Sequence, residues 1–128
     1  MKVIVVGGGK IGFYLTRTLL EHGHEPVLIE KDPDVCLRVA NSLDLPVIQG
    51  DGTVLDTLEN AGIRGCDALI GVSGQDENNL VACQLAKRYF GVKRTVARVN
   101  NPKNLPVMKQ LGVDIPISST DNIARLLE

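Results

Sequence analysis

The sequence predicts an α/β protein in which a six-stranded parallel sheet lies between two layers of helices. Short runs rich in Val and Ile alternate along the chain with patterns of helical period, as is typical of parallel βαβ units. The first such run is followed at once by a glycine-rich turn and a helical pattern. With 128 residues, 44% of them hydrophobic, the chain can form one core, so we expect a single domain over residues 1–128.

The first strand is expected at Lys2–Val6, because near-continuous Val and Ile are typical of a strand covered on both faces. A helix follows over Lys10–His22, and Gly23 is suited to end it. The apolar face of this helix is expected to consist of Ile11, Tyr14, Leu15, Thr18 and Leu19. The next strand is expected at Glu25–Ile29.

A second helix opens at Asp32-Pro33, with Asp32 as the cap and proline at the first helical position. Pro46–Gln49 is expected to form the third strand, and a helix to run from Thr53 to about Asn60. The apolar set predicted for the second helix is Val35, Cys36, Val39, Ala40 and Leu43.

The second half of the chain repeats the alternation. The acidic residues that open the helix after the fourth strand suit the positive end of a helix dipole. The strands are expected at Asp67–Val72, Lys93–Val99 and Asp114–Ile117, and the helices at Gln75–Tyr89, from Asn101-Pro102 to about Leu111, and from Ser118 toward Glu128.

The glycine-rich turn has the spacing Gly7-x-Gly9-x-x-Gly12 between the first strand and the first helix. In this setting Gly7 permits the tight turn, Gly9 allows a pyrophosphate to approach the backbone, and Gly12 allows close packing of helix and strand. Free amides and the positive helix end favour a phosphate anion. The motif therefore predicts a Rossmann-type fold that binds phosphate at residues 7–12, which include Gly8, Lys10 and Ile11.

Glu30 ends the second strand, 18 positions after Gly12, where dinucleotide-binding folds place an acid. A carboxylate at this position accepts hydrogen bonds from both ribose hydroxyls and repels a 2′-phosphate. The predicted ligands are therefore NAD(H), ATP, ADP or AMP rather than NADP(H). The neighbouring Lys31 weakens the exclusion of a 2′-phosphate slightly.

Further candidate ligand contacts follow the third and fourth strands, because ligands bind at the carboxyl ends of parallel strands. Asp51, followed by Gly52, is expected either to bond the adenine edge or to serve as a turn residue. Ser73, followed by Gly74, is expected either to face the nucleotide or to cap the next helix. Two cations, Lys10 and Arg98, are predicted near the phosphates, and Lys10 is equally compatible with a solvated position.

Composition and missing motifs exclude several other classes of protein. The net charge of −1 provides no attraction to nucleic acid, and Lys87, Arg88, Lys93 and Arg94 are interpreted as a solvated helix end. No P-loop, G-x-S-x-G or H-E-x-x-H motif occurs. His22 and His24 lack partners at zinc-ligand spacing. The cysteines, Cys36, Cys66 and Cys83, are expected to be buried structural residues in a reducing compartment.

The chain as a whole resembles the N-terminal domain of regulators of K⁺ conductance, also called the KTN or TrkA-N domain. The similarity rests on the segments Val5–Gly12, Leu28–Glu30, Gly50–Thr53, Asp67–Gly74, Asp76–Leu80, Ala97–Pro102 and Leu111–Asp114. The resemblance implies that residues 7–11 surround phosphate, Glu30 binds ribose, Asp51 and Gly52 lie near adenine, Ser73 and Gly74 follow the ribose-phosphate path, and Arg98 points toward a phosphate.

The resemblance also implies a regulatory role at the inner face of the cell membrane. Such domains form dimers or rings and gate a membrane-embedded K⁺ transporter or channel. We expect a binding protein rather than an enzyme, because no second domain is present to bring substrate to a nicotinamide. The alternative is the cofactor-binding half of an NAD-dependent oxidoreductase. A third possibility is a nucleotide-sensing domain attached to a cation/proton antiporter or a glutathione-gated efflux system.

Overall fold

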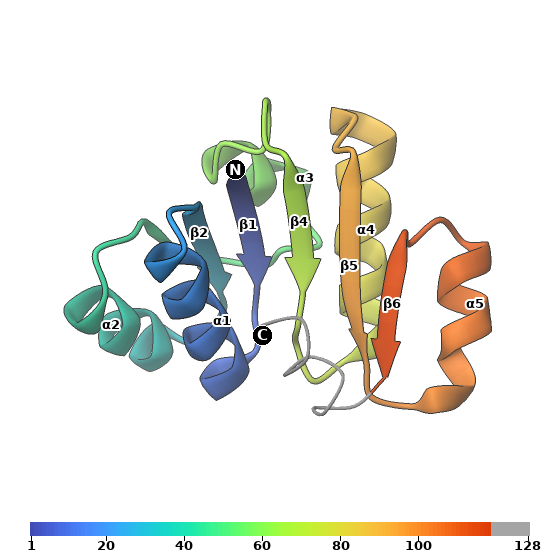
Figure 1. Ribbon diagram of the computed structural model, residues 1–128, viewed down its shortest axis with the longest axis horizontal. Helices are drawn as coiled ribbons and strands as arrows, with labels where there is room; N and C mark the ends of the chain where they lie inside the picture. The colour runs from blue at the N-terminus through green and yellow to red at the C-terminus, as the bar shows by residue number, and fades with distance from the viewer. Residues whose placement is uncertain (119–128) are drawn as a thin grey trace.

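The computed structural model describes residues 1–118 and confirms the predicted α/β class. A single sheet of six parallel strands has the order β3-β2-β1-β4-β5-β6, with helices on both faces (Figure 1). The chain passes from one edge of the sheet back to its middle between β3 and β4, so the order of strands reverses between β1 and β4. In open parallel sheets, ligands bind in the crevice at the carboxyl side of this reversal.

The elements agree with the sequence-based bounds to within one or two residues, apart from the late helices. The strands are β1 (Lys2–Val6), β2 (Glu25–Glu30), β3 (Val47–Gln49), β4 (Ala68–Gly71), β5 (Arg94–Val99) and β6 (Ile115–Ser118). The helices are α1 (Gly9–Glu21), α2 (Pro33–Ser42), α3 (Leu55–Asn60), α4 (Asp76–Phe90), the short 3-10 turn η1 (Pro102–Asn104) and α5 (Leu105–Gln110).

Three predicted helices need correction or fall beyond the described part. The single helix expected from Asn101 to Leu111 is divided into η1 and α5, because Pro106 at the start of α5 has no amide to continue the earlier turn. The helix expected from Thr53 begins two residues later, since the Thr53 amide and hydroxyl both bind the Asp51 carboxylate. Ser118 ends β6, and the rest of the last predicted helix lies outside the described residues.

Two apolar layers hold the helices to the sheet, one on each face. Alternate residues of β1 point to opposite faces, so Val3 and Val5 pack with α1 and α2, and Ile4 and Val6 pack with the other layer. Leu15 and Val39 anchor α1 and α2 on the first face. The second layer is built from buried residues of α3, α4 and α5, namely Leu58, Ala82, Cys83, Ala86 and Met108.

The predicted helix boundaries have the expected caps, but two predicted core positions are wrong. Gly23 ends the first helical segment with φ 82°, and its amide donates to Leu20 O at 3.1 Å. Asp32 caps α2 by accepting a hydrogen bond from the Asp34 amide at 2.9 Å. Tyr14 is 56% exposed, because the buried face of α1 consists of Gly12, Leu15 and Thr16 and Tyr14 faces outward. Ala40 is also exposed, because Val39 is the buried residue of α2.

Two of the three cysteines are buried as expected, and Cys36 is only half-buried. Burial raises the pKa of Cys83 to about 12, which leaves its thiol protonated and unreactive. Among the cations that were interpreted as solvated, Lys87 forms an ion pair with Asp114, with Nζ and Oδ1 2.7 Å apart, so this part of the interpretation is wrong. No helix within residues 1–118 is both long and apolar enough to cross a lipid bilayer.

Candidate functional site

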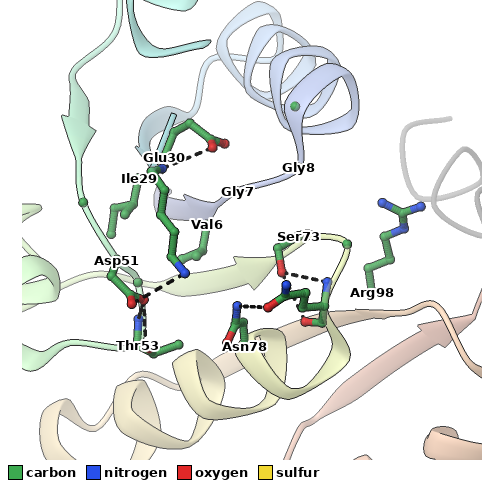
Figure 2. A pocket seen from close by; sticks show the side chains of 16 residues that line it. Val6, Gly7, Gly8, Ile29, Glu30, Asp51, Thr53, Ser73, Asn78 and Arg98 are labelled. Atoms are coloured by element: carbon green, nitrogen blue, oxygen red, sulfur yellow. Dashed lines mark hydrogen bonds and ion pairs between the residues drawn. The ribbon is translucent and has the colours of Figure 1, made fainter. Parts of the chain in front are cut away.

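A cleft of about 570 Å³ opens at the carboxyl ends of the central strands, where the order of strands reverses. Figure 2 shows side chains from several separate segments converging on it. Ten of the thirteen residues predicted to bind ligand line this cleft: Gly7, Gly8, Gly9, Glu30, Lys31, Asp51, Gly52, Ser73, Gly74 and Arg98. Sequence motifs that lie far apart in the chain therefore form a single site.

The glycine turn places the start of α1 against the cleft. Gly8 is the residue before the helix and has φ 100°, a conformation that favours glycine. The first amides of a helix have no acceptors within it, and no side chain caps this end of α1. A Cβ on Gly9 would meet nothing within 4 Å, so the backbone at this point is open to a ligand. The arrangement favours an anionic group such as phosphate.

Gly12 has a different role, which the sequence also predicted. A Cβ on Gly12 would lie 2.2 Å from the carbonyl oxygen of Gly7. Only glycine at this position lets α1 pack so closely on the turn. The backbone at residue 7 is also fixed on the other side, because the Gly7 amide donates to the Ile29 carbonyl at 2.8 Å.

Glu30 is held at the end of β2 with one carboxylate oxygen occupied and one without a partner. Oε1 accepts hydrogen bonds from the amides of Lys31 and Asp32 at 3.1 and 3.3 Å. Oε2 is buried, and within residues 1–118 it is the one buried side-chain oxygen or nitrogen without a hydrogen-bond partner. A buried oxygen without a donor is costly. A ligand hydroxyl that donates to Oε2 removes this cost.

Asp51 is already bound by protein groups on both carboxylate oxygens. Oδ1 accepts from the amide and the hydroxyl of Thr53 at 2.8 and 2.6 Å, and Oδ2 lies 3.6 Å from Lys31 Nζ (Figure 2). The hydroxyl and amide of Thr53, helped by the Lys31 ammonium, lower the pKa of Asp51 against the opposing effect of burial. Of the two roles expected for Asp51, the structure shows the turn role, and contact with adenine stays a prediction.

Ser73 takes part in a local turn and in a network centred on Asn79. The Ser73 hydroxyl accepts from the Gln75 amide at 3.3 Å and donates to Asn79 Oδ1 at 2.8 Å. Of the two roles expected for Ser73, capping of α4 is not seen, because Gln75 is the residue before this helix and no side chain caps it. Ser73 lines the cleft, and its contact with a nucleotide stays a prediction. Asn79 is fully buried, and its Nδ2 donates to the carbonyls of Ser73 and Arg98, both at 2.9 Å. The Asn79 amide therefore joins the ends of β4 and β5 beneath the cleft.

A second network of hydrogen bonds, centred on Asp76, fixes the segment that follows β5. Asp76 is 7% exposed and accepts hydrogen bonds from the Asn100 and Asn101 amides and the Asn100 and Asn104 side chains, at 2.6 to 2.9 Å. Burial opposes ionisation of Asp76, but these donors outweigh it and lower the pKa of the carboxyl. Asp76 lies in the first turn of α4, as predicted for an acid at the positive end of the helix, and its carboxylate also binds the loop that follows β5.

Arg98 lies at the opposite end of the cleft from Glu30 and Asp51. Its side chain extends from β5, and Figure 2 shows the guanidinium without a dashed contact to the residues drawn. β2 and β5 are separated by β1 and β4, so their ends are roughly 14 Å apart at the usual strand spacing. The cleft thus has two carboxylates at one end, one of them paired with Lys31, and the Arg98 cation at the other.

Three predicted binding residues do not line this cleft. The Lys10 side chain lines a separate groove between α1 and α2, together with Phe13 and Arg38. Ile11 packs against the apolar layer on the α1 side of the sheet, and Gly12 lies behind the turn. The predicted proximity of the Lys10 side chain to the phosphate position is therefore not seen in this structure, because the side chain leaves the first turn of α1 on the side of α2.

Several residues line the cleft that the sequence did not single out. They comprise Val6, Ile29, Gly50, Thr53, Gln75 and Asn78. Gly50 and Thr53 flank the recognised Asp51-Gly52 turn, and Gln75 and Asn78 lie at the start of α4, so their positions after strands were available signals. Asn79 had no such signal, because its hydrogen bonds go to Ser73 and Arg98, which lie 6 and 19 residues away.

Comparisons with known proteins show which family the chain resembles. The Trk system potassium uptake protein TrkA homolog of Methanothermobacter thermautotrophicus is 38% identical over the whole chain, and TrkA of Mycobacterium tuberculosis is 39% identical. The chain spans 59% and 58% of the length of these relatives.

Solved structures with the same fold include two that hold adenine nucleotides. GsuK bound to ADP is 27% identical with a TM-score of 0.79, and the match covers 98% of this chain and 32% of that one. The AMP-bound Kef C-terminal domain of Shewanella denitrificans is 25% identical with a TM-score of 0.78, over 98% of this chain and 77% of that one. The family model of the TrkA-N domain matches residues 3–119, and this chain therefore belongs to the TrkA-N domain family.

Proposed function

We propose that this domain binds an adenine nucleotide with free ribose hydroxyls and that binding regulates potassium transport. The candidate ligands are NAD(H), ATP, ADP and AMP. The observation that carries the proposal is Glu30 Oε2, a buried carboxylate oxygen without a donor in the same cleft as the glycine turn. Two ribose hydroxyls can donate to such a carboxylate, so the residues present fit the ligand class.

The position of each end of the cleft supports one orientation of the nucleotide. Glu30 binds the ribose, the amides at Gly8 and Gly9 bind the first phosphates, and Arg98 neutralises a more distant phosphate. Ser73 and Gly74 border the path between them, and Asp51 and Gly52 border the adenosine end. GsuK and the Kef domain, solved with ADP and AMP, support the ligand class.

The regulatory part of the proposal rests on the family. The named relatives are potassium uptake proteins, and the whole-protein function is extended here to a chain that spans less than two thirds of their length. The domain acts at the inner face of the membrane, as a homodimer or ring, on a membrane-embedded K⁺ transporter or channel subunit. It binds its ligand without catalysing a reaction. The nucleotide can shift this partner only through different affinities for two arrangements of the assembly.

Replacing Glu30 by alanine is expected to weaken the binding of AMP, ADP and NADH by about 1–3 kcal/mol, the scale of hydrogen bonds to a charged group. Isothermal titration calorimetry measures the change. The matched control is Glu25→Ala, which removes an exposed glutamate from the opposite end of the same strand. Equal affinities of the Glu30→Ala variant and the parent protein for all three nucleotides would refute the assignment of ribose to Glu30.

A further inference from the structure

The adenosine end of the cleft contains a cation that points away from the proposed ribose position. Lys31 directly follows Glu30, and its amide donates to Glu30 Oε1 at 3.1 Å. The Lys31 ammonium extends instead to Asp51 Oδ2, 3.6 Å away, at the end of β3 (Figure 2). Neighbouring residues in the sequence thus present a carboxylate to the ribose and a lysine to a different strand.

Asp51 is a fixed partner for this lysine. Its Oδ1 accepts two short hydrogen bonds from Thr53, and both residues belong to the turn after β3. The Gly50 amide donates to the Glu30 carbonyl at 2.9 Å, which ties this turn to the end of β2. The carboxylate is therefore held in one place, and the flexible lysine side chain reaches it across the adenosine end of the cleft.

We propose that the Lys31–Asp51 ion pair determines selectivity against 2′-phosphorylated nucleotides, by holding the Lys31 ammonium away from the ribose. The inference rests on the proposed function, because it places ribose at Glu30. A 2′-phosphate at that position meets the Glu30 carboxylate and needs a compensating cation. Lys31 is the cation nearest to Glu30 in the sequence, and its ammonium is already paired with Asp51. Asp51 thus acts as a positioning residue through Lys31.

The strength of the Lys31–Asp51 ion pair limits how far its loss can change the selectivity against 2′-phosphorylated nucleotides. The side chains of Lys31 and Asp51 are 59% and 39% exposed, so the pair is partly screened by solvent and by salt. A single substitution is therefore sufficient to release the lysine. Once released, the ammonium can form a charge-assisted contact with a 2′-phosphate, and the gain in affinity equals the cost of the broken ion pair, about threefold to fivefold.

The test compares two ligands that differ only in the 2′-phosphate, AMP and adenosine 2′,5′-bisphosphate. The measured quantity is the ratio of their dissociation constants, determined by calorimetry for the parent, Asp51→Asn, Lys31→Met and the double variant. Asparagine can still accept the two hydrogen bonds from Thr53, so Asp51→Asn retains the turn. Thermal unfolding of each variant checks its fold. NADH and NADPH provide a second matched pair.

The expected result is that the effect of Asp51→Asn on this ratio depends on whether Lys31 is present. Asp51→Asn lowers the ratio of the bisphosphate constant to the AMP constant by about threefold to fivefold when Lys31 is present, and by less than about twofold in the Lys31→Met background. Equal effects in the two backgrounds, or no effect in either, overturn the inference while leaving the proposed function intact. If none of NAD(H), ATP, ADP and AMP binds the parent protein, the proposed function fails, and the inference fails with it.

Discussion

Replacing Gly12 by alanine is expected to destabilise the domain by about 3 kcal/mol or more, as severe overpacking does. Alanine in the middle of a helix is normally favoured over glycine by about 1 kcal/mol. The opposite result is expected here because the added Cβ would lie 2.2 Å from the Gly7 carbonyl oxygen, a backbone atom that cannot move independently. Relief of this contact requires α1 to move away from the turn, which also disturbs the proposed phosphate position.

Chemical denaturation measures this loss of stability. The matched control is Gly74→Ala, since Gly74 lines the same cleft but a Cβ there would meet nothing within 4 Å. We expect the control to change the free energy of unfolding by no more than about 0.5 kcal/mol. A Gly12→Ala variant as stable as the parent would show that helix and turn are not packed as described.

Replacing Asn79 by aspartate is expected to cost about 3–5 kcal/mol, the range for an uncompensated charge in a buried network. Aspartate has nearly the same shape, but it substitutes an acceptor for the amide group that donates to the carbonyls of Ser73 and Arg98. The side chain is fully buried, so solvent cannot replace the lost donors. The ends of β4 and β5 are then no longer joined under the cleft.

Denaturation of Asn79→Asp is best compared with Asn78→Asp, the same substitution one residue earlier. Asn78 is partly exposed and lies in the first turn of α4, where a negative charge is favourable. We expect Asn78→Asp to stay within about 1 kcal/mol of the parent. Similar losses in the two variants would mean that the Asn79 network does not support this end of the sheet.

The placements that the sequence predicted correctly belong to local motifs. Gly8 and Glu30 line the cleft and Gly12 packs behind the turn, as expected, because a strand, a turn and a helix follow one another directly in the chain. The hydrophobic pattern also predicted the six parallel strands, because strands covered on both faces are nearly continuous in Val and Ile.

The roles that the sequence did not reveal depend on distant partners or on side-chain direction. The sequence placed Asp76 at a helix start but could not reveal what its carboxylate binds, because its four hydrogen bonds go to residues 24 to 28 positions away. Lys10 belongs to the glycine motif, but its side chain lines the groove between α1 and α2. Lys31 likewise gave no signal that it pairs with Asp51 rather than with a ligand.

Thermal unfolding with a panel of nucleotides tests the central claim most directly. The panel contains NAD⁺, NADH, NADPH, ATP, ADP and AMP, all supplied at the same concentration, and each shift is confirmed by calorimetry. A ligand at 100 times its Kd adds about 2.7 kcal/mol of stability, which corresponds to a rise in Tm of roughly 10 °C for a domain of this size. We expect such a rise with at least one ligand that has free ribose hydroxyls and none with NADPH. No rise with any nucleotide, or an equal rise with NADH and NADPH, would contradict the account.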